Sequence, residues 1–137
     1  MSMTVRAEVS KKNEYWIDRH RYYELRHFCL QYLLWKKAYE EPDGVYAKQL
    51  YFMPTKTEPA NPTEDAAIRK LYFHERMQMV EKAAKNTDKS LADYILKGVT
   101  EAMSYDHLKS RLDIPCSKEV YYDLYRKFFW ILSQARG

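Results

Sequence analysis

The chain has 137 residues, of which 46% are hydrophobic and 15% aromatic, and it carries a formal net charge of +4. This length suits a single hydrophobic core, while only three glycines exclude a glycine-rich phosphate loop and a sheet built on glycine turns. The small positive charge permits binding to phosphate without requiring it. We therefore predict an all-α protein.

The cysteines and the hydropathy of the sequence indicate the cellular compartment. The two cysteines lie far apart in sequence, which indicates no disulfide framework. No run of about twenty apolar residues is present, so the sequence predicts no membrane span. No signal peptide pattern precedes the first helix. We expect a cytoplasmic protein without contact to a membrane.

The N-terminal part is expected to be an arm, a helix and a linker. Residues 1–14 lack periodicity, whereas residues 16–39 repeat apolar side chains at steps of three and four. Glu-Pro-Asp-Gly at 41–44 ends this helix, and prolines prevent a long helix in residues 45–61. The apolar stripe of the helix consists of Tyr22, Leu25, Cys29, Tyr32 and Leu33.

Two interpretations of this aromatic helix stay open. In the first, the apolar stripe is simply core. In the second, aromatic residues outside the stripe form an exposed surface for a dimer partner or for RNA polymerase. Those residues are Tyr23, Phe28, Trp35 and Tyr39.

A second unit is predicted from residue 61 onward, which gives a division into residues 1–60 and 61–137. Asn61 and Pro62 form a helix start, because Asn caps well and Pro suits the first helical position. This helix should run to about Lys85. Its predicted stripe is Ala67, Leu71, His74, Met77 and Val80 or Glu81.

Three short-spaced helices are predicted after the break at residues 86–88. The first carries Leu91 and Ile95, and the second begins after a cap at Ser104. A turn over residues 113–116 then leads to Ser117, which caps a long last helix.

The last two helices have the layout of a helix-turn-helix. Their expected apolar contacts are Leu108, Leu112 and Ile114 against Val120, Leu124, Phe128, Ile131 and Leu132. A short helix, a tight turn with a buried apolar residue and a serine-capped longer helix are typical of this motif. A helical hairpin without a DNA-binding role has the same spacing. In the motif, the second helix enters the major groove with its N-terminal residues nearest the bases.

The residues expected to point outward have chemistry suited to duplex DNA. Lys118 and Arg126 can neutralise phosphates or reach guanine, and Glu119 can accept from a cytosine amino group. The free N–H groups of a helix start bind phosphate oxygens. Tyrosines can donate to phosphates or pack on thymine methyl groups. The predicted DNA-contacting residues are Ser117, Lys118, Glu119, Tyr121, Tyr122, Tyr125 and Arg126, with Lys109 and Arg111 for backbone contact.

A family resemblance rests on the order of motifs over roughly residues 60–134. Asn-Pro-Thr-Glu at 61–64 precedes a charged helix, and the run from Leu108 to Ser117 precedes Tyr121-Tyr122 and then Arg-Lys-Phe-Phe at 126–129. This layout resembles that of phage late-transcription regulators of the RinA/ArpU type, found in phages and prophages of Gram-positive bacteria, whose C-terminal region is similar to region 4 of a sigma factor.

The resemblance implies a transcriptional regulator in a bacterial host, bound to double-stranded DNA, with RNA polymerase or a second copy as further partners. It places Ser117, Lys118, Glu119, Tyr122 and Arg126 on the DNA-reading helix. Two departures concern specificity. Pro115 and Cys116 fill the turn, and the expected recognition surface carries tyrosines where basic or amide residues read bases more strongly.

Two alternatives to a DNA-binding regulator are kept. A phage-encoded adaptor or inhibitor would use the same helices to bind a host protein, and a small DNA-packaging (terminase) subunit would share the helix-turn-helix but assemble into a ring. Affinity for duplex DNA that falls with salt separates a DNA-binding protein from a protein adaptor.

Neither a metal site nor an enzyme is predicted. The four histidines form no H-x-x-x-H pair, and no C-x-x-C is present. His27 and Cys29 are two apart on a predicted helix, so their side chains diverge. Cys116 precedes a helix start, where a thiolate is favoured, but no orienting base can be assigned, and a buried turn residue is the favoured interpretation. We expect no cofactor.

Overall fold

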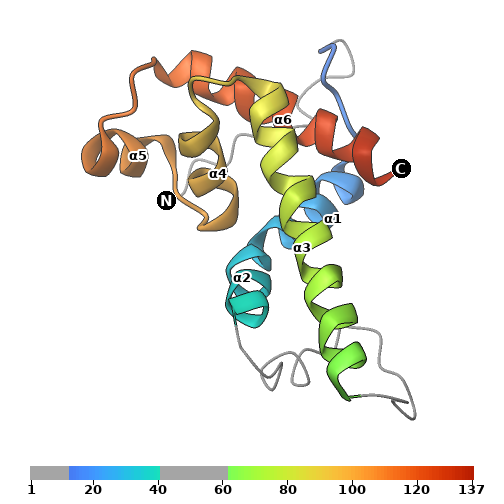
Figure 1. Ribbon diagram of the computed structural model, residues 1–137. Coiled ribbons are helices and arrows are strands. Elements are labelled where there is room, and N and C mark those ends of the chain that lie inside the picture. The colour runs from blue at the N-terminus through green and yellow to red at the C-terminus, as the bar shows by residue number, and fades with distance from the viewer. Residues whose placement is uncertain (1–12, 41–61) are drawn as a thin grey trace. The chain divides into compact units, whose positions relative to one another are not determined.

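A computed structural model describes residues 13–40 and 62–137, and this part of the chain consists of helices joined by turns (Figure 1). No strand occurs within these ranges, which confirms the all-α prediction there. The helices are α1 (Arg19–Leu30), α2 (Tyr32–Glu40), α3 (Pro62–Thr87), α4 (Ala92–Thr100), α5 (Tyr105–Leu112) and α6 (Lys118–Arg136).

The described residues form two compact units. The first contains residues 13–31 and 79–137, and the second contains residues 32–40 and 62–78. The predicted division at residue 60 stays a prediction, and in the first unit α1 packs with α4 and α6. The expected arm and linker at residues 1–12 and 41–61 lie outside the described residues.

The predicted N-terminal helix is two helices, separated at Gln31. The Asp18 carboxylate caps α1 by accepting from the His20 N–H at 3.0 Å. The Gln31 N–H bonds back to Phe28 at 3.2 Å, a one-turn closure that ends α1. Because the helix is interrupted at Gln31, the apolar repeat of α1 does not continue into α2. The expectation that Leu33 belongs to the core was therefore wrong, and Leu33 is exposed.

The interpretation that the first helices carry an exposed aromatic surface is largely wrong. Phe28 and Trp35 are buried, together with most of the predicted stripe. Tyr23 is half-buried, and only Tyr39 has substantial exposure. In the second unit Tyr39 stacks on His74 of α3, with ring centroids 5.5 Å apart. The aromatic rings therefore serve mainly as packing.

The buried side of α3 includes Met77 and Val80 of the predicted stripe but differs from it nearer the helix start. Leu71 is 55% exposed and Ala67 is exposed, whereas Phe73 is fully buried. The helix buries the series Phe73, Met77, Val80 and Ala84, whose steps of four, three and four follow the helical repeat. Phe73 and Leu71 point in nearly opposite directions, and burying the larger aromatic side chain removes more apolar area from water.

The core of the first unit is built where α1 meets α6 and α4. Its largest fully buried side chains are Tyr22, Leu25, Ile95, Leu108, Ile114, Tyr121, Phe128, Phe129 and Leu132. Full burial of such a side chain contributes roughly 1.5–3 kcal/mol to the free energy of folding. The buried side chains of α1 therefore help to hold α1 and α6 together.

Local capping follows the predictions closely. The Ser104 hydroxyl accepts from the His107 N–H at 3.2 Å, and the Ser117 hydroxyl accepts from the Val120 N–H at 3.3 Å. These bonds confirm the predicted starts of the last two helices. None of the helices described is both long and apolar enough to cross a membrane.

Candidate nucleic-acid interface

The turn between α5 and α6 is closed by backbone bonds and a buried anchor. Asp113 adopts the left-handed conformation (φ 51°, ψ 51°), which Asp tolerates better than most residues, and its N–H donates to the last turn of α5. Ile114 follows and is fully buried, as predicted. The Cys116 N–H donates to the Ile114 carbonyl at 3.0 Å, which reverses the chain toward α6.

Side chains of α5 hold the turn in place. The Tyr105 hydroxyl donates to the Cys116 carbonyl at 2.6 Å, and the Lys109 ammonium donates to the Ile114 carbonyl at 3.3 Å. Lys109 also pairs with the Asp113 carboxylate at 3.1 Å, and this hydrogen bond raises the pKa of Lys109. Lys109, predicted to contact the DNA backbone, is therefore committed in part to the turn itself.

The start of α6 is exposed. Ser117, Lys118, Glu119 and Val120 all face solvent. The first N–H groups of the helix lack an intrahelical acceptor, and the helix dipole places partial positive charge there. Within residues 13–40 and 62–137, the Lys118 side chain makes neither a hydrogen bond nor an ion pair. This end of α6 therefore presents Lys118 without an ion-pair partner, next to the exposed Glu119 and free backbone donors.

The expectation that the tyrosines of α6 point outward was wrong. Tyr121 is 1% exposed and Tyr122 is buried, while the Tyr125 hydroxyl bonds to the Tyr22 hydroxyl at 2.7 Å. Burial raises the pKa of Tyr121 and of Tyr125. All three rings belong to one aromatic cluster, with Tyr121 in ring contact with both Tyr122 and Tyr125. Tyr121 and Tyr122 are core residues, and the half-buried Tyr125 packs against them.

Because these tyrosines are buried, the apolar face of α6 is not the one predicted from the sequence. Val120 is 46% exposed and Leu124 is half-buried, although both were predicted to hold the hairpin. The competing stripes share Phe128 and Leu132, and the stripe with Tyr121 buries larger rings against α1 and α5. Sequence periodicity alone does not separate the two, because both follow the helical repeat.

Arg126 is only partly available. Its guanidinium pairs with the Asp123 carboxylate at 2.7 Å, and its side chain is 18% exposed against 70% for Asp123. A predicted phosphate-binding cation is therefore neutralised by its own neighbour one turn earlier.

No protein family, curated protein or solved structure matches this chain.

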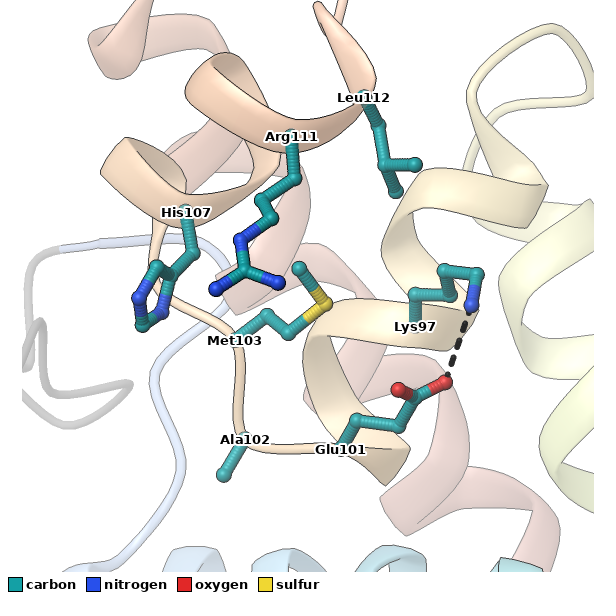
Figure 2. A pocket seen from close by; sticks show the side chains of 7 residues that line it. All are labelled: Lys97, Glu101, Ala102, Met103, His107, Arg111 and Leu112. Atoms are coloured by element: carbon teal, nitrogen blue, oxygen red, sulfur yellow. Dashed lines mark hydrogen bonds and ion pairs between the residues drawn. The ribbon is translucent and has the colours of Figure 1, made fainter.

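Arg111 lies away from the turn, although it was predicted to act with Lys109. Two residues apart on a helix, the two side chains point roughly 200° from each other. Arg111 lines a pocket formed with the end of α4, as Figure 2 shows. The structure therefore brings Ser117, Lys118 and Glu119 together at the start of α6 and sends Arg111 to a different face of α5.

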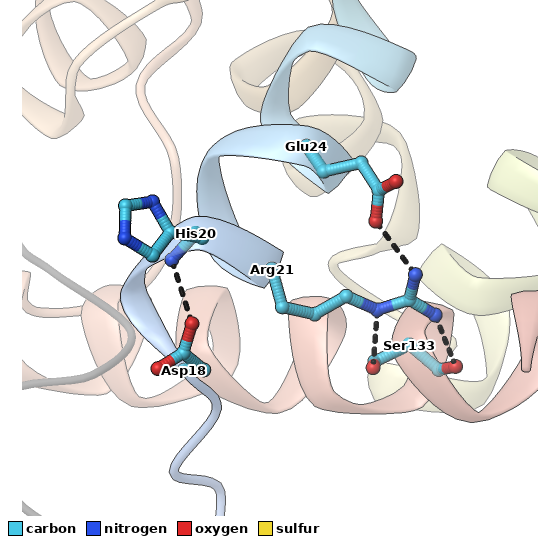
Figure 3. Close-up of polar contacts among 5 residues, drawn as sticks. All are labelled: Asp18, His20, Arg21, Glu24 and Ser133. Atoms are coloured by element: carbon cyan, nitrogen blue, oxygen red, sulfur yellow. Dashed lines mark hydrogen bonds and ion pairs between the residues drawn. The ribbon is translucent and has the colours of Figure 1, made fainter.

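The C-terminal half of α6 is hydrogen-bonded to α1 (Figure 3). The Arg21 guanidinium donates to the Ser133 hydroxyl and to the Ser133 carbonyl, both at 3.0 Å, and pairs with Glu24 at 2.7 Å. The Arg136 guanidinium lies 3.8 Å from the centre of the Phe28 ring. Sequence reasoning missed Arg21 because its acceptor lies 112 residues away and no local pattern marks it.

The chemistry of the described residues offers no metal centre. No cluster of three or more metal-ligating side chains occurs in the part of the chain that the structure describes. Cys116 is half-buried, and burial raises the pKa of its thiol, as it does for Cys29. Both shifts disfavour the reactive thiolate.

Proposed function

We propose that this protein is a DNA-binding transcriptional regulator of phage or prophage origin that reads the major groove with the start of α6. The observation that supports the proposal is the exposed, serine-capped first turn of α6, in which Lys118 has no partner among the described residues. A helix start of this kind binds a phosphate oxygen through backbone N–H groups and a nearby cation.

The proposed contact set is smaller than the predicted one. It consists of Ser117, Lys118, Glu119 and Val120, the exposed residues of the first turn. Lys118 would meet a phosphate or guanine, Glu119 a cytosine amino group, and Val120 a thymine methyl group. Val120 enters this set because the rotation of α6 that buries Tyr121 leaves Val120 in solvent.

The charge balance around the turn predicts a modest dependence on salt. Asp113 and Asp123 flank the first turn of α6 and pair with Lys109 and Arg126, so neither of these two cations is fully available to phosphate. In protein–DNA binding the logarithm of affinity falls with the logarithm of salt with a slope of about −0.9 for each phosphate neutralised. We expect a slope that corresponds to only a few phosphates.

Lys118→Gln tests the proposal on the full chain. We expect this variant to bind a pool of labelled random-sequence duplexes about ten-fold more weakly and to reduce the salt slope by about one, because one phosphate contact is lost. Fluorescence anisotropy at low and moderate salt measures both. Lys36→Gln is the matched control, because Lys36 is exposed on α2, outside α5 and α6.

The proposal fails if the wild-type chain binds no duplex at low salt, or if Lys118→Gln binds as tightly as the wild type. If the wild-type chain does bind, selection of bound duplexes from the same pool identifies the operator. Enrichment of a single sequence supports a regulator, whereas uniform binding supports a packaging role.

A second candidate function is protein binding through the second unit. Large apolar side chains are exposed on both of its helices, namely Leu33 and Leu34 on α2 and Ile68 and Leu71 on α3. Isolated exposed apolar residues are ordinary, but several on one small unit favour a protein contact. In a regulator this unit would bind RNA polymerase or a second copy of the chain, and in an adaptor it would bind a host protein.

A further inference from the structure

A pocket of about 430 Å³ lies between the end of α4 and α5, on a face of α5 that the proposed DNA contact does not use (Figure 2). The turn to α6 lies against Tyr105 and Lys109, whereas the pocket is bordered by side chains nearer the opposite side of α5. Its lining residues are Lys97, Glu101, Ala102, Met103, His107, Arg111 and Leu112.

The pocket contains one cation whose charge is not offset. The Lys97 ammonium is paired with the Glu101 carboxylate at 3.3 Å on one wall. The Arg111 guanidinium extends from the other wall toward Met103, and it makes no hydrogen bond or ion pair within the described ranges (Figure 2). A guanidinium presents a planar fork of donors that matches a carboxylate in a bidentate pair.

Three of the remaining lining residues, Ala102, Met103 and Leu112, are apolar, and the fourth is His107. Met103 is half-buried, and Leu112, which was predicted to face α6 as core, is 37% exposed and lines the pocket instead. Methionine adapts its shape to different apolar partners. A pocket of this volume is in the usual range for a bound ligand and has room for a few side chains of a peptide.

We propose that this pocket binds an acidic peptide segment of a partner protein. A Glu or Asp carboxylate of the segment pairs with Arg111, and a neighbouring aliphatic side chain packs on Met103 and Leu112. One feature favours a peptide over the phosphate backbone of DNA, because a phosphate backbone offers nothing to cover the two apolar side chains. The proposal does not depend on DNA binding by α6.

The test uses the full chain with ¹³C-labelled methionine methyl groups. The Met103 resonance is assigned by its loss in Met103→Leu. The probe is the blocked peptide acetyl-Leu-Glu-Glu-Leu-Leu-amide, and its neutral partner replaces both Glu with Gln. We expect a saturable shift of the Met103 methyl resonance with the acidic peptide, and binding about ten-fold weaker or more with the Gln peptide, because a charge-assisted hydrogen bond is lost.

Arg111→Gln should abolish the shift, whereas the matched control Arg19→Gln should retain it, since Arg19 is exposed on α1 and does not line the pocket. Circular dichroism checks that each variant keeps its helix content. Lys118→Gln should bind the peptide like the wild type, which separates this proposal from DNA binding.

Three results would overturn the proposal. The first is no shift of the Met103 resonance at millimolar peptide. The second is an unchanged shift in Arg111→Gln. The third is the same shift with inorganic phosphate or with duplex DNA, competing with the peptide, which would reassign the pocket to phosphate.

Discussion

Single side chains decide how closely the helices of the first unit approach. Gly98 lies in α4 beside the hydroxyl end of Tyr121, and a Cβ added at Gly98 would clash with the Tyr121 hydroxyl oxygen. That hydroxyl is buried and makes no hydrogen bond with a described residue. The sequence presents Gly98 as a weak point of a helix, whereas the structure gives it a packing reason.

Gly98→Ala is expected to destabilise the protein by about 1–3 kcal/mol, the usual cost of overpacking a core. Tyr121→Phe should be neutral or stabilising, because it removes a buried hydroxyl without a partner. The double variant should recover most of the loss, since the nearest clashing atom is gone. Urea unfolding of all four proteins measures the coupling, and strictly additive effects would show that the two residues do not meet.

Among the elements, α4 differs in how it begins. Its N-cap residue, Leu91, has no capping side chain, and the carboxylate of Asp88 serves instead. This carboxylate accepts from the Ser90 hydroxyl at 2.7 Å and from the N–H groups of Ser90 and Leu91 at 2.9 and 3.0 Å. The Ser90 hydroxyl is the main cause of a lowered pKa at Asp88, with the two N–H groups adding to it.

The stability that Asp88 contributes should therefore depend on pH. A lowered pKa in the folded state means that the contribution is present above the pKa of the unfolded chain and is lost as pH falls through the folded value. We expect Asp88→Ala to cost about 0.5–2 kcal/mol at neutral pH, as for other capping residues. Urea unfolding should show that this difference shrinks in strong acid. A difference that is constant with pH would assign the loss to helix propensity instead.

At the scale of the whole molecule, the contact between α1 and α6 joins distant parts of the sequence. Arg21 meets Ser133, and Tyr22 meets Tyr125 and Phe129. These contacts determine which side of α6 is buried, and therefore which residues its first turn exposes. The candidate DNA-reading surface is in this sense a product of the packing of α1.

The assignment of faces on α6 gives a direct test. Phe129→Ala should cost about 3–5 kcal/mol, because it empties a fully buried site between α6 and α1. Val120→Ala should change the free energy of unfolding by no more than about 0.5 kcal/mol, since Val120 is largely exposed. Denaturant unfolding measures both. A larger loss for Val120→Ala than for Phe129→Ala would restore the face predicted from periodicity.

Sequence alone determined the all-helical class, the start of α3 at Pro62 and the caps at Ser104 and Ser117. These features depend on residues within about one helical turn of each other, so their signals are local and readable. The buried turn residue Ile114 was predictable for the same reason, because a single apolar residue in a polar turn has few other places to go.

Only the tertiary structure decided which faces are buried. Two apolar stripes on α6 follow the same helical repeat, and the choice between Val120 and Tyr121 depends on the shape of the surface that α1 and α5 offer. The hydrogen bond of Arg21 to Ser133 and the close approach of Gly98 to the Tyr121 hydroxyl join residues that no local pattern connects. Periodicity shows that a helix has an apolar side, but the side that is buried depends on the packing partner, which lies elsewhere in the sequence.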